Sequence, residues 1–265
     1  MNLKTLLMKL FLKRIFNSSY LISIRNLIGF KTVKIKIPIT KKSISISDSF
    51  IWRTDNNFQT ILRFTDILKK FYETFQLPET EIIFYSKDNI KLKSILIDNN
   101  EINNELIIDK NFLNNTEDYG LFYIYHSKKN HLSPEKITLS NRCYVGYSKK
   151  GSNPSYVHGN YLARFRIFGE EKEYSNLVQK TFLHKKTYKI QTSFKNYDKT
   201  ELCFANPTNS LVKFKINGEK HSIGAGALKI INVQTDEIIS ISSKLLFFRP
   251  IIFNYNRKFI DIFHS

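Results

Sequence analysis

The chain has 265 residues, of which 42% are hydrophobic and 14% aromatic, and this composition excludes a disordered protein. The length matches one large or two modest domains, and we take two as the expected number. The formal net charge is +18, but ten basic residues precede the first acidic one, Asp48, which leaves +8 for the rest of the chain. More than half of the excess charge therefore lies in an N-terminal arm. For this reason nucleic acid is the weakest of the ligand classes considered.

Residues 1–30 predict a helix with one apolar face. That face carries Leu3, Leu6, Leu7, Leu10 and Phe11, and the lysines fall mostly outside it. Cations interrupt the apolar run too often for a secretory signal or for a spanning helix, which needs about 20 apolar residues. Either the arm lies on an anionic membrane surface or binds a membrane-bound partner, or it packs on its own domain or on a partner subunit. A transit-type peptide is the third alternative.

The stretch after the arm predicts a strand with one wet face. Val33, Ile35, Ile37 and Ile39 alternate there with polar residues. Residues 1–43 are therefore predicted to form a basic amphipathic arm with a leading strand.

A compact segment, residues 47–57, holds the only tryptophan, Trp52. A Trp beside an Arg where a strand meets a turn is usually a core anchor, and the alternative is a platform for a ligand. Alternation over residues 58–64 then predicts a strand, and a short helix over residues 66–75 follows. One helix across both stretches competes with this interpretation, because their apolar residues also keep heptad spacing.

Two pairs of similar segments indicate an internal duplication. The first pair is residues 80–84 and 200–204, each a strand pattern followed by a polar turn and an alternating strand. In the second copy Asn217-Gly218 then gives a strong hairpin signal. In the second pair, Arg142 precedes His158 by 16 positions and Arg249 precedes His264 by 15.

These repeats predict a mainly β fold built from two tandem antiparallel β-sandwich-like units behind an N-terminal amphipathic helix. The units span residues 44–160 and 187–265, and residues 161–186 form the connector. Short alternating runs separated by turns every 8 to 12 residues or so are typical of antiparallel sandwiches and barrels.

Common catalytic and nucleotide-binding motifs are absent from the sequence, which has no Walker loop, no G-x-G-x-x-G after a strand, no H-E-x-x-H and no G-x-S-x-G. Gly224-Ala225-Gly226 is better explained as a turn or bulge. The six histidines lack zinc-like spacing, and the acidic run at residues 170–173 belongs to a solvated connector. We therefore predict neither a cofactor nor a metal.

The chain has two cysteines, Cys143 and Cys203, one in each predicted unit. They offer neither a disulfide framework nor a zinc site, so we expect two buried, reduced thiols. This favours a cytoplasmic protein, placed at the inner face of the membrane if the arm binds there.

The densest group of binding or reactive side chains surrounds His158. The candidate ligand-binding residues are Arg142, Tyr144, Tyr147, Tyr156, His158, Asn160 and Trp52. Imidazole transfers protons near neutral pH, guanidinium holds carboxylate or phosphate, and an amide binds a hydroxyl. Together with aromatic planes, these groups suit a glycan or nucleotide sugar. Arg249 and His264 are their pseudo-equivalents in the second unit, and the alternative is that each Arg–His pair is a structural corner that satisfies backbone carbonyls.

Three short motifs carry a resemblance: residues 47–57, Tyr156-Val157-His158-Gly159-Asn160 and residues 261–265. Together they resemble uncharacterised bacterial proteins associated with surface-polysaccharide synthesis, over about residues 45–265. The resemblance implies a glycan context and supplies no catalytic residue.

The function predicted on these grounds is a non-enzymatic glycan-related binding or accessory protein held at the cytoplasmic membrane surface. The first alternative is an enzyme that modifies a sugar or nucleotide sugar at a site centred on His158. The second is a basic nucleic-acid-binding protein. Whether the chain is an enzyme stays open, since function resides in sites rather than folds.

Overall fold

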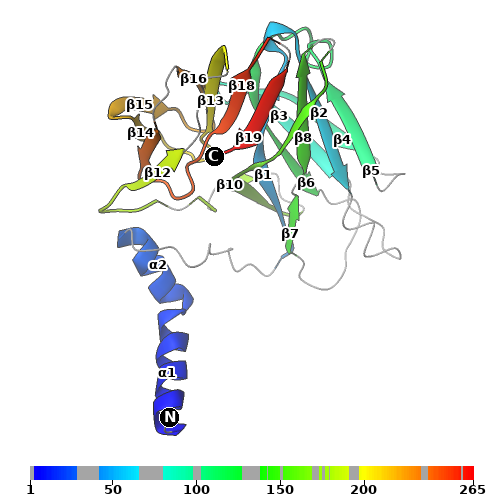
Figure 1. Cartoon of the computed structure of the whole chain (residues 1–265). Coiled ribbons are helices and arrows are strands. Elements are labelled where there is room, and N and C mark those ends of the chain that lie inside the picture. The colour runs from blue at the N-terminus through cyan, green and yellow to red at the C-terminus, as the bar shows by residue number, and fades with distance from the viewer. Residues whose placement is uncertain are drawn as a thin grey trace.

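The computed structural model describes residues 3–28, 42–65, 80–97, 103–126, 138–141, 143–149, 152–168, 173–174, 177–178, 180–190, 197–233, 238–257 and 259–265. Two helices stand at the N-terminus, and the remainder is mainly β (Figure 1). Neither described helix is long and apolar enough to cross a membrane.

The predicted helical arm is confirmed as two helices, α1 (Leu3–Phe16) and α2 (Ser19–Ile28). Figure 1 shows α1 extending away from the β structure, with the end of α2 near the segment that precedes strand β12. The backbone N–H of Phe182 donates a hydrogen bond to the carbonyl of Leu27, which ties α2 to the segment before β12. The strand predicted at residues 33–39 lies outside the described residues.

The first sheet has the strand order β11-β10-β1-β6-β3-β4, and β7 pairs with β1 in parallel. Its strands are β1 (Ile44–Arg53), β3 (Thr80–Ser86), β4 (Lys91–Ile97), β6 (Tyr119–His126), β7 (Thr138–Asn141), β10 (Asn160–Ile167) and β11 (Glu173–Tyr174). β10 begins the predicted connector and yet pairs with the first half of β1. Every residue of β1 is buried, and its serines are satisfied by the neighbouring strand: Ser45 and Ser47 accept hydrogen bonds from backbone N–H groups of β6.

The other three sheets have four strands each. The second has the order β5 (Asn103–Ile108), β2 (Phe58–Thr65), β8 (Tyr144–Lys149), β9 (Ser155–His158). The third has the order β12 (Lys186–Ile190), β17 (Ile239–Ser243), β14 (Val212–Ile216), β15 (Glu219–Ile223). The fourth has the order β16 (Leu228–Val233), β13 (Lys199–Ala205), β18 (Ile251–Tyr255), β19 (Ile260–His264).

The prediction of two tandem sandwich units is wrong. The strands form small sheets in the arrangement of a four-bladed β-propeller. The physical reason is visible in β13, which is buried on both faces. Leu202 and Phe204 point into one hydrophobic core, whereas Cys203 and Ala205 point into another core that also contains Trp52. The buried residues of the first of these cores all lie within residues 187–265, whereas the second core joins residues from both predicted units, so the two units are not independent of each other.

The two sequence repeats have different structural outcomes. In the first pair, β3 pairs directly with β4, whereas β13 and β14 belong to different sheets. In the second pair, each His ends a hairpin and lies opposite the first residue of the preceding strand: His158 pairs with Tyr144, and His264 with Ile251. The duplication as a whole stays a prediction.

Several local predictions are confirmed. The stretch from residue 58 forms strand β2, and the helix predicted after it, at residues 66–75, lies outside the described residues. Asn217 and Gly218 turn the β14–β15 hairpin with φ angles of 45° and 91°, the left-handed conformation that this turn requires. Gly226 has φ 67° in the turn predicted for Gly224-Ala225-Gly226.

Candidate functional site

Two of the predicted binding residues are structural. Trp52 is fully buried, and its indole N–H donates a hydrogen bond to the carbonyl of Tyr85 at 2.8 Å. Tyr147 is also fully buried; its hydroxyl donates to the carbonyl of Ile51 at 2.9 Å, and its ring meets that of Phe253 edge-on. Burial raises the pKa of the Tyr147 phenol well above 10. Trp52 thus acts as the core anchor that its sequence context favoured.

The other aromatic candidates meet on the second sheet. The rings of Tyr144 and His158 lie 4.2 Å apart across the β8–β9 pair, and both side chains are exposed. Tyr156 packs over Gly146, where an added Cβ would come within 2.6 Å of the Tyr ring. Arg63 places its guanidinium 5.0 Å from the centre of the same ring. Sequence reasoning missed Arg63, which is near this patch only because β2 pairs with β8.

The second His of the repeat joins the first. The Nε2–H of His264 donates to the carbonyls of His158 and Gly159, at 2.8 and 3.0 Å. Burial lowers the pKa of His264 below its ordinary 6.5, although these two hydrogen bonds oppose the shift. Arg249 contacts the carbonyl of Ser265 instead, at 3.4 Å. His264 therefore satisfies backbone carbonyls, as the structural interpretation of the Arg–His pairs expects.

Asn160 begins β10 opposite Ser49. Arg142 lies outside the described residues, so its relation to His158 stays a prediction. The corner thus brings together Tyr144, Tyr156 and His158, and leaves Trp52 and Tyr147 in the core.

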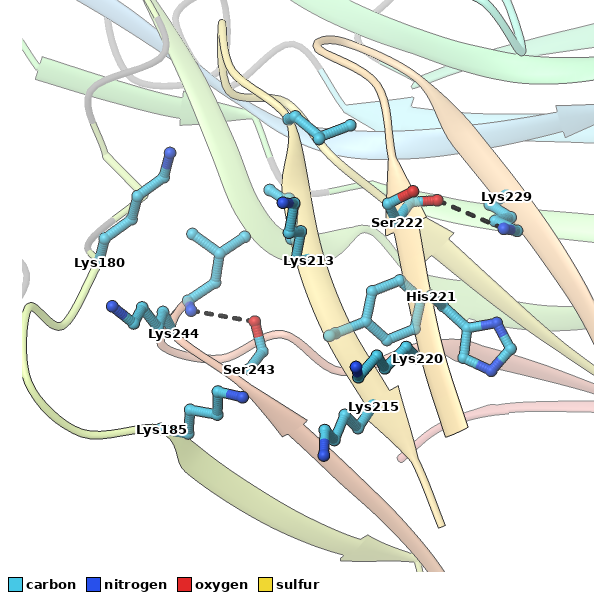
Figure 2. A pocket seen from close by; sticks show the side chains of 14 residues that line it. Lys180, Lys185, Lys213, Lys215, Lys220, His221, Ser222, Lys229, Ser243 and Lys244 are labelled. Carbon is cyan, nitrogen blue, oxygen red and sulfur yellow. Dashed lines mark hydrogen bonds between the residues drawn. The ribbon is translucent and has the colours of Figure 1, made fainter. Parts of the chain in front are cut away.

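A cavity of about 830 Å³ lies over the third sheet. Its lining contains seven lysines: Lys213 and Lys215 on β14, Lys220 on β15, Lys229 on β16, Lys244 after β17, and Lys180 and Lys185 before and at the edge of β12 (Figure 2). Among the residues that the structure describes, the lining contains no acidic side chain. We call this site the lysine pocket.

The strand register forces some of these cations together. Lys215 lies directly opposite Lys220 in the β14–β15 hairpin, an arrangement of like charges that destabilises a sheet. Three other lysines donate to neutral oxygens: Lys180 to Ser210, Lys229 to Ser222 and Lys244 to Phe182. Within the described part of the chain, no ion pair joins a pocket lysine to a carboxylate.

Side chains other than lysine complete the pocket. The His221 ring is tilted against that of Phe214, with the ring centres 5.4 Å apart, and its Nε2 is 3.8 Å from a carboxylate oxygen of Glu219, which is itself largely exposed. Ser222 and Ser243 add hydroxyls to the lining, and Leu245 adds an apolar surface. The pocket therefore combines a high density of positive charge with hydrogen-bonding groups.

The sequence carried a signal for this pocket that composition obscured. Lysine is frequent throughout the chain, so a single lysine carries little information about a site. The hairpin turn at Asn217-Gly218, however, already places Lys215 opposite Lys220. The lysines on β16, after β17 and before β12 reach the same cavity only through the tertiary fold.

A second charged cluster is buried where the two halves of the chain meet. Arg53, 1% exposed, makes a two-point ion pair with Asp55 at 2.7 and 2.9 Å, and its Nη1 lies 2.5 Å from Glu201. Tyr255 donates to the same Glu201 carboxylate. The Arg53 guanidinium also lies over the rings of Phe58 and Phe253, at 4.4 and 4.9 Å. We call these residues the Arg53 cluster.

The two cysteines are free and buried, as predicted. Burial raises the pKa of the Cys203 thiol to about 12 and that of Cys143 further, so neither is a ready nucleophile. Among the described residues, His, Cys, Asp and Glu form no group that could hold a metal ion.

Comparison with curated proteins finds a distant similarity. The chain is 27% identical to an uncharacterised protein of Plasmodium falciparum (isolate 3D7) over 194 residues, which are 67% of this chain and 12% of that protein. No family model matches the chain. Neither result bears on the resemblance to surface-polysaccharide proteins.

Proposed function

We propose that this chain is a binding protein whose lysine pocket takes up a small polyanion, and that the ligand carries several phosphate groups on a sugar or polyol. The observation that carries the proposal is the gathering of seven lysines around one cavity whose described lining holds no carboxylate. Like charges held together without a counterion cost stability, and a polyanion removes that cost on binding.

The size and chemistry of the pocket favour this ligand class. A volume of about 830 Å³ lies within the range of small-molecule sites, about 300–1,000 Å³. Lysine binds phosphate as a point charge, and the hydroxyls of Ser222 and Ser243 suit the hydroxyls of a polyol. A phosphorylated sugar therefore unites the predicted glycan context with the cations of the third sheet.

Isothermal titration calorimetry of the full chain with inositol hexakisphosphate tests this proposal. We expect binding that weakens as salt is raised, since exposed cations are screened. Unphosphorylated inositol should give no binding heat. A single-stranded oligonucleotide that bound more tightly than the phosphorylated polyol would instead favour the nucleic-acid alternative.

The decisive variant is Lys215→Gln/Lys220→Gln, which keeps side-chain length and removes the opposed charges. It should weaken binding at least about tenfold, equivalent to about 1.4 kcal/mol. The matched control is Lys91→Gln/Lys110→Gln, which removes two exposed lysines elsewhere. Equal losses in the two variants would mean that net charge alone, rather than the pocket, attracts the anion.

A further inference from the structure

We infer that α1, α2 and the rim of the lysine pocket form one surface that docks on an anionic lipid bilayer, so that the polyanion bound in the pocket is the phosphorylated headgroup of a lipid. This inference rests on the proposed function of the lysine pocket, and it adds that the ligand is part of a membrane surface.

The first step is the apolar surface of α1. Leu7, Phe11 and Ile15 follow one another at intervals of four residues along one side of the helix, and Met8 and Leu12 lie next to them. These five side chains are 43–63% exposed, although each would gain by leaving water. Lys9 and Lys13 lie on the opposite side of the helix, which they share with the exposed Leu6 and Leu10. This face is shifted from the predicted one, because Arg14 falls within the predicted apolar face.

The length of α1 decides how such a helix meets a membrane. Its 14 residues extend about 21 Å, whereas the hydrocarbon core of a bilayer is about 30 Å thick. A short helix with an apolar side and a cationic side lies in the interface, with the apolar side among the acyl chains and the lysines at the headgroups.

The second step is the continuity between this arm and the pocket. The carbonyl of Leu27 in α2 accepts the backbone N–H of Phe182, and the carbonyl of Phe182 accepts the pocket amine of Lys244 at 3.0 Å. Phe182 and its neighbour Leu183 are 67% and 60% exposed. Two apolar side chains thus project from the loop that lies between the pocket lysines Lys180 and Lys185.

The third step is charge. The helices carry Lys4, Lys9, Lys13, Arg14 and Arg25, and no acidic residue precedes Asp48. Next to them lies the lysine pocket, in which the described part of the lining holds no carboxylate. An anionic bilayer matches both properties together, because it offers acyl chains to the apolar side chains and phosphate groups to the cations a few ångströms above them.

Flotation of the full chain with lipid vesicles tests the inference. Three compositions are compared: phosphatidylcholine alone, phosphatidylcholine with phosphatidylserine, and phosphatidylcholine with a phosphatidylinositol bisphosphate. We expect little flotation with the first, more with the second and most with the third, and inositol hexakisphosphate should compete with the third.

Three variants separate the parts of the surface. Leu7→Ser/Phe11→Ser removes the apolar side of α1, and Phe182→Ser/Leu183→Ser removes the apolar rim. Each should reduce binding to both anionic vesicles at least about tenfold. Lys215→Gln/Lys220→Gln should remove the preference for the bisphosphate. The control Ile90→Ser/Leu96→Ser, two exposed apolar residues beside and on β4, should leave binding unchanged.

The outcomes distinguish this inference from the proposed function. Calorimetric binding of inositol hexakisphosphate without flotation on any vesicle would overturn the docking surface and leave the pocket's function in place. Flotation that depends on α1 but not on the pocket lysines would overturn the headgroup assignment. A dimer in light scattering that Leu7→Ser/Phe11→Ser converts to a monomer would show that a second copy covers α1, and would also overturn the inference.

Discussion

The Arg53 cluster and the lysine pocket are both dense in charge, and they differ in what balances that charge. Arg53 is buried, and Asp55 and Glu201 pair with it while Phe58 and Phe253 cover it. The pocket lysines stand around an open cavity, and Lys215 even faces Lys220. A buried charge must be paired within the protein, whereas exposed like charges are solvated by water and can be neutralised later by a bound ligand. The first cluster therefore holds the fold together, and the second is the better candidate for binding.

Removal of the buried charge should have the largest effect. Arg53→Met leaves Glu201 without its main partner in a dry site, so the free energy of unfolding should fall by about 3–5 kcal/mol. Urea denaturation measures this change. The control Arg63→Gln breaks an exposed pair with Glu105 and should change stability little. A fall for Arg53→Met as small as the control's would contradict a stabilising role for the cluster.

The same cluster should make the protein sensitive to acid. Burial pushes the pKa of Glu201 upward, but the attraction of Arg53 and the hydrogen bonds from Lys199 and Tyr255 outweigh it and hold the pKa below its ordinary 4.5. A carboxylate whose pKa is lower folded than unfolded adds stability above the unfolded value, and that stability is lost as pH falls through the folded value. Melting temperature should therefore fall below about pH 4.5, and less steeply in Glu201→Gln. Parallel curves of melting temperature against pH for the unmodified protein and Glu201→Gln would exclude Glu201 as the cause. Glu105→Gln, which removes an exposed carboxylate, is the control.

Substitution of the two histidines of the repeat, His158 and His264, should change stability by smaller and unequal amounts. His264→Ala removes the hydrogen bonds to two carbonyls and should lower stability by about 1 kcal/mol, whereas exposed His158→Ala should change it less. Because the folded pKa of His264 is lowered, its contribution is present above pH 6.5 and is lost as pH falls through the folded value. Thermal unfolding across this range measures it. Loss of sugar binding in His158→Ala at unchanged melting temperature would make the exposed corner a binding site in its own right.

Removal of the opposed lysines, Lys215 and Lys220, should have the smallest effect on stability of these substitutions, and it should stabilise the protein rather than destabilise it. Lys215→Gln/Lys220→Gln relieves cross-strand repulsion and should raise the free energy of unfolding by up to about 1 kcal/mol. Thermal denaturation at low salt measures the gain, which should shrink as salt rises. A loss of stability would mean that the lysines serve the fold rather than a ligand.

Local elements were predictable from the sequence because their causes are local. The alternation at residues 58–64 gives β2, the apolar spacing in residues 1–30 gives helix, and Asn217-Gly218 gives the hairpin. Trp52 beside Arg53 was recognised as a core anchor for the same reason. The partner of Arg53 was not predictable, since Glu201 lies 148 positions away and no periodic pattern connects the two.

The arrangement of the sheets was predicted wrongly for a physical reason. The continuous apolar run at residues 202–205 indicates that β13 is buried, but it does not show that the two faces of the strand lie against separate cores. Leu202 and Phe204 serve one core and Cys203 and Ala205 the other, which makes the fourth sheet common to both halves. A repeat in the sequence therefore does not become two independent units.

The N-terminal arm and the lysine pocket show the same difference between local features, which the sequence determines, and long-range contacts, which it does not. The sequence by itself determined that the first residues are helical, apolar and basic, because helix periodicity and net charge are properties of short segments. Only the tertiary structure decided that lysines from separate strands line one cavity and that the loop carrying Phe182 connects it to α2. Contacts of this kind join residues far apart in the chain, and they depend on which faces of the sheets are buried rather than on any local pattern.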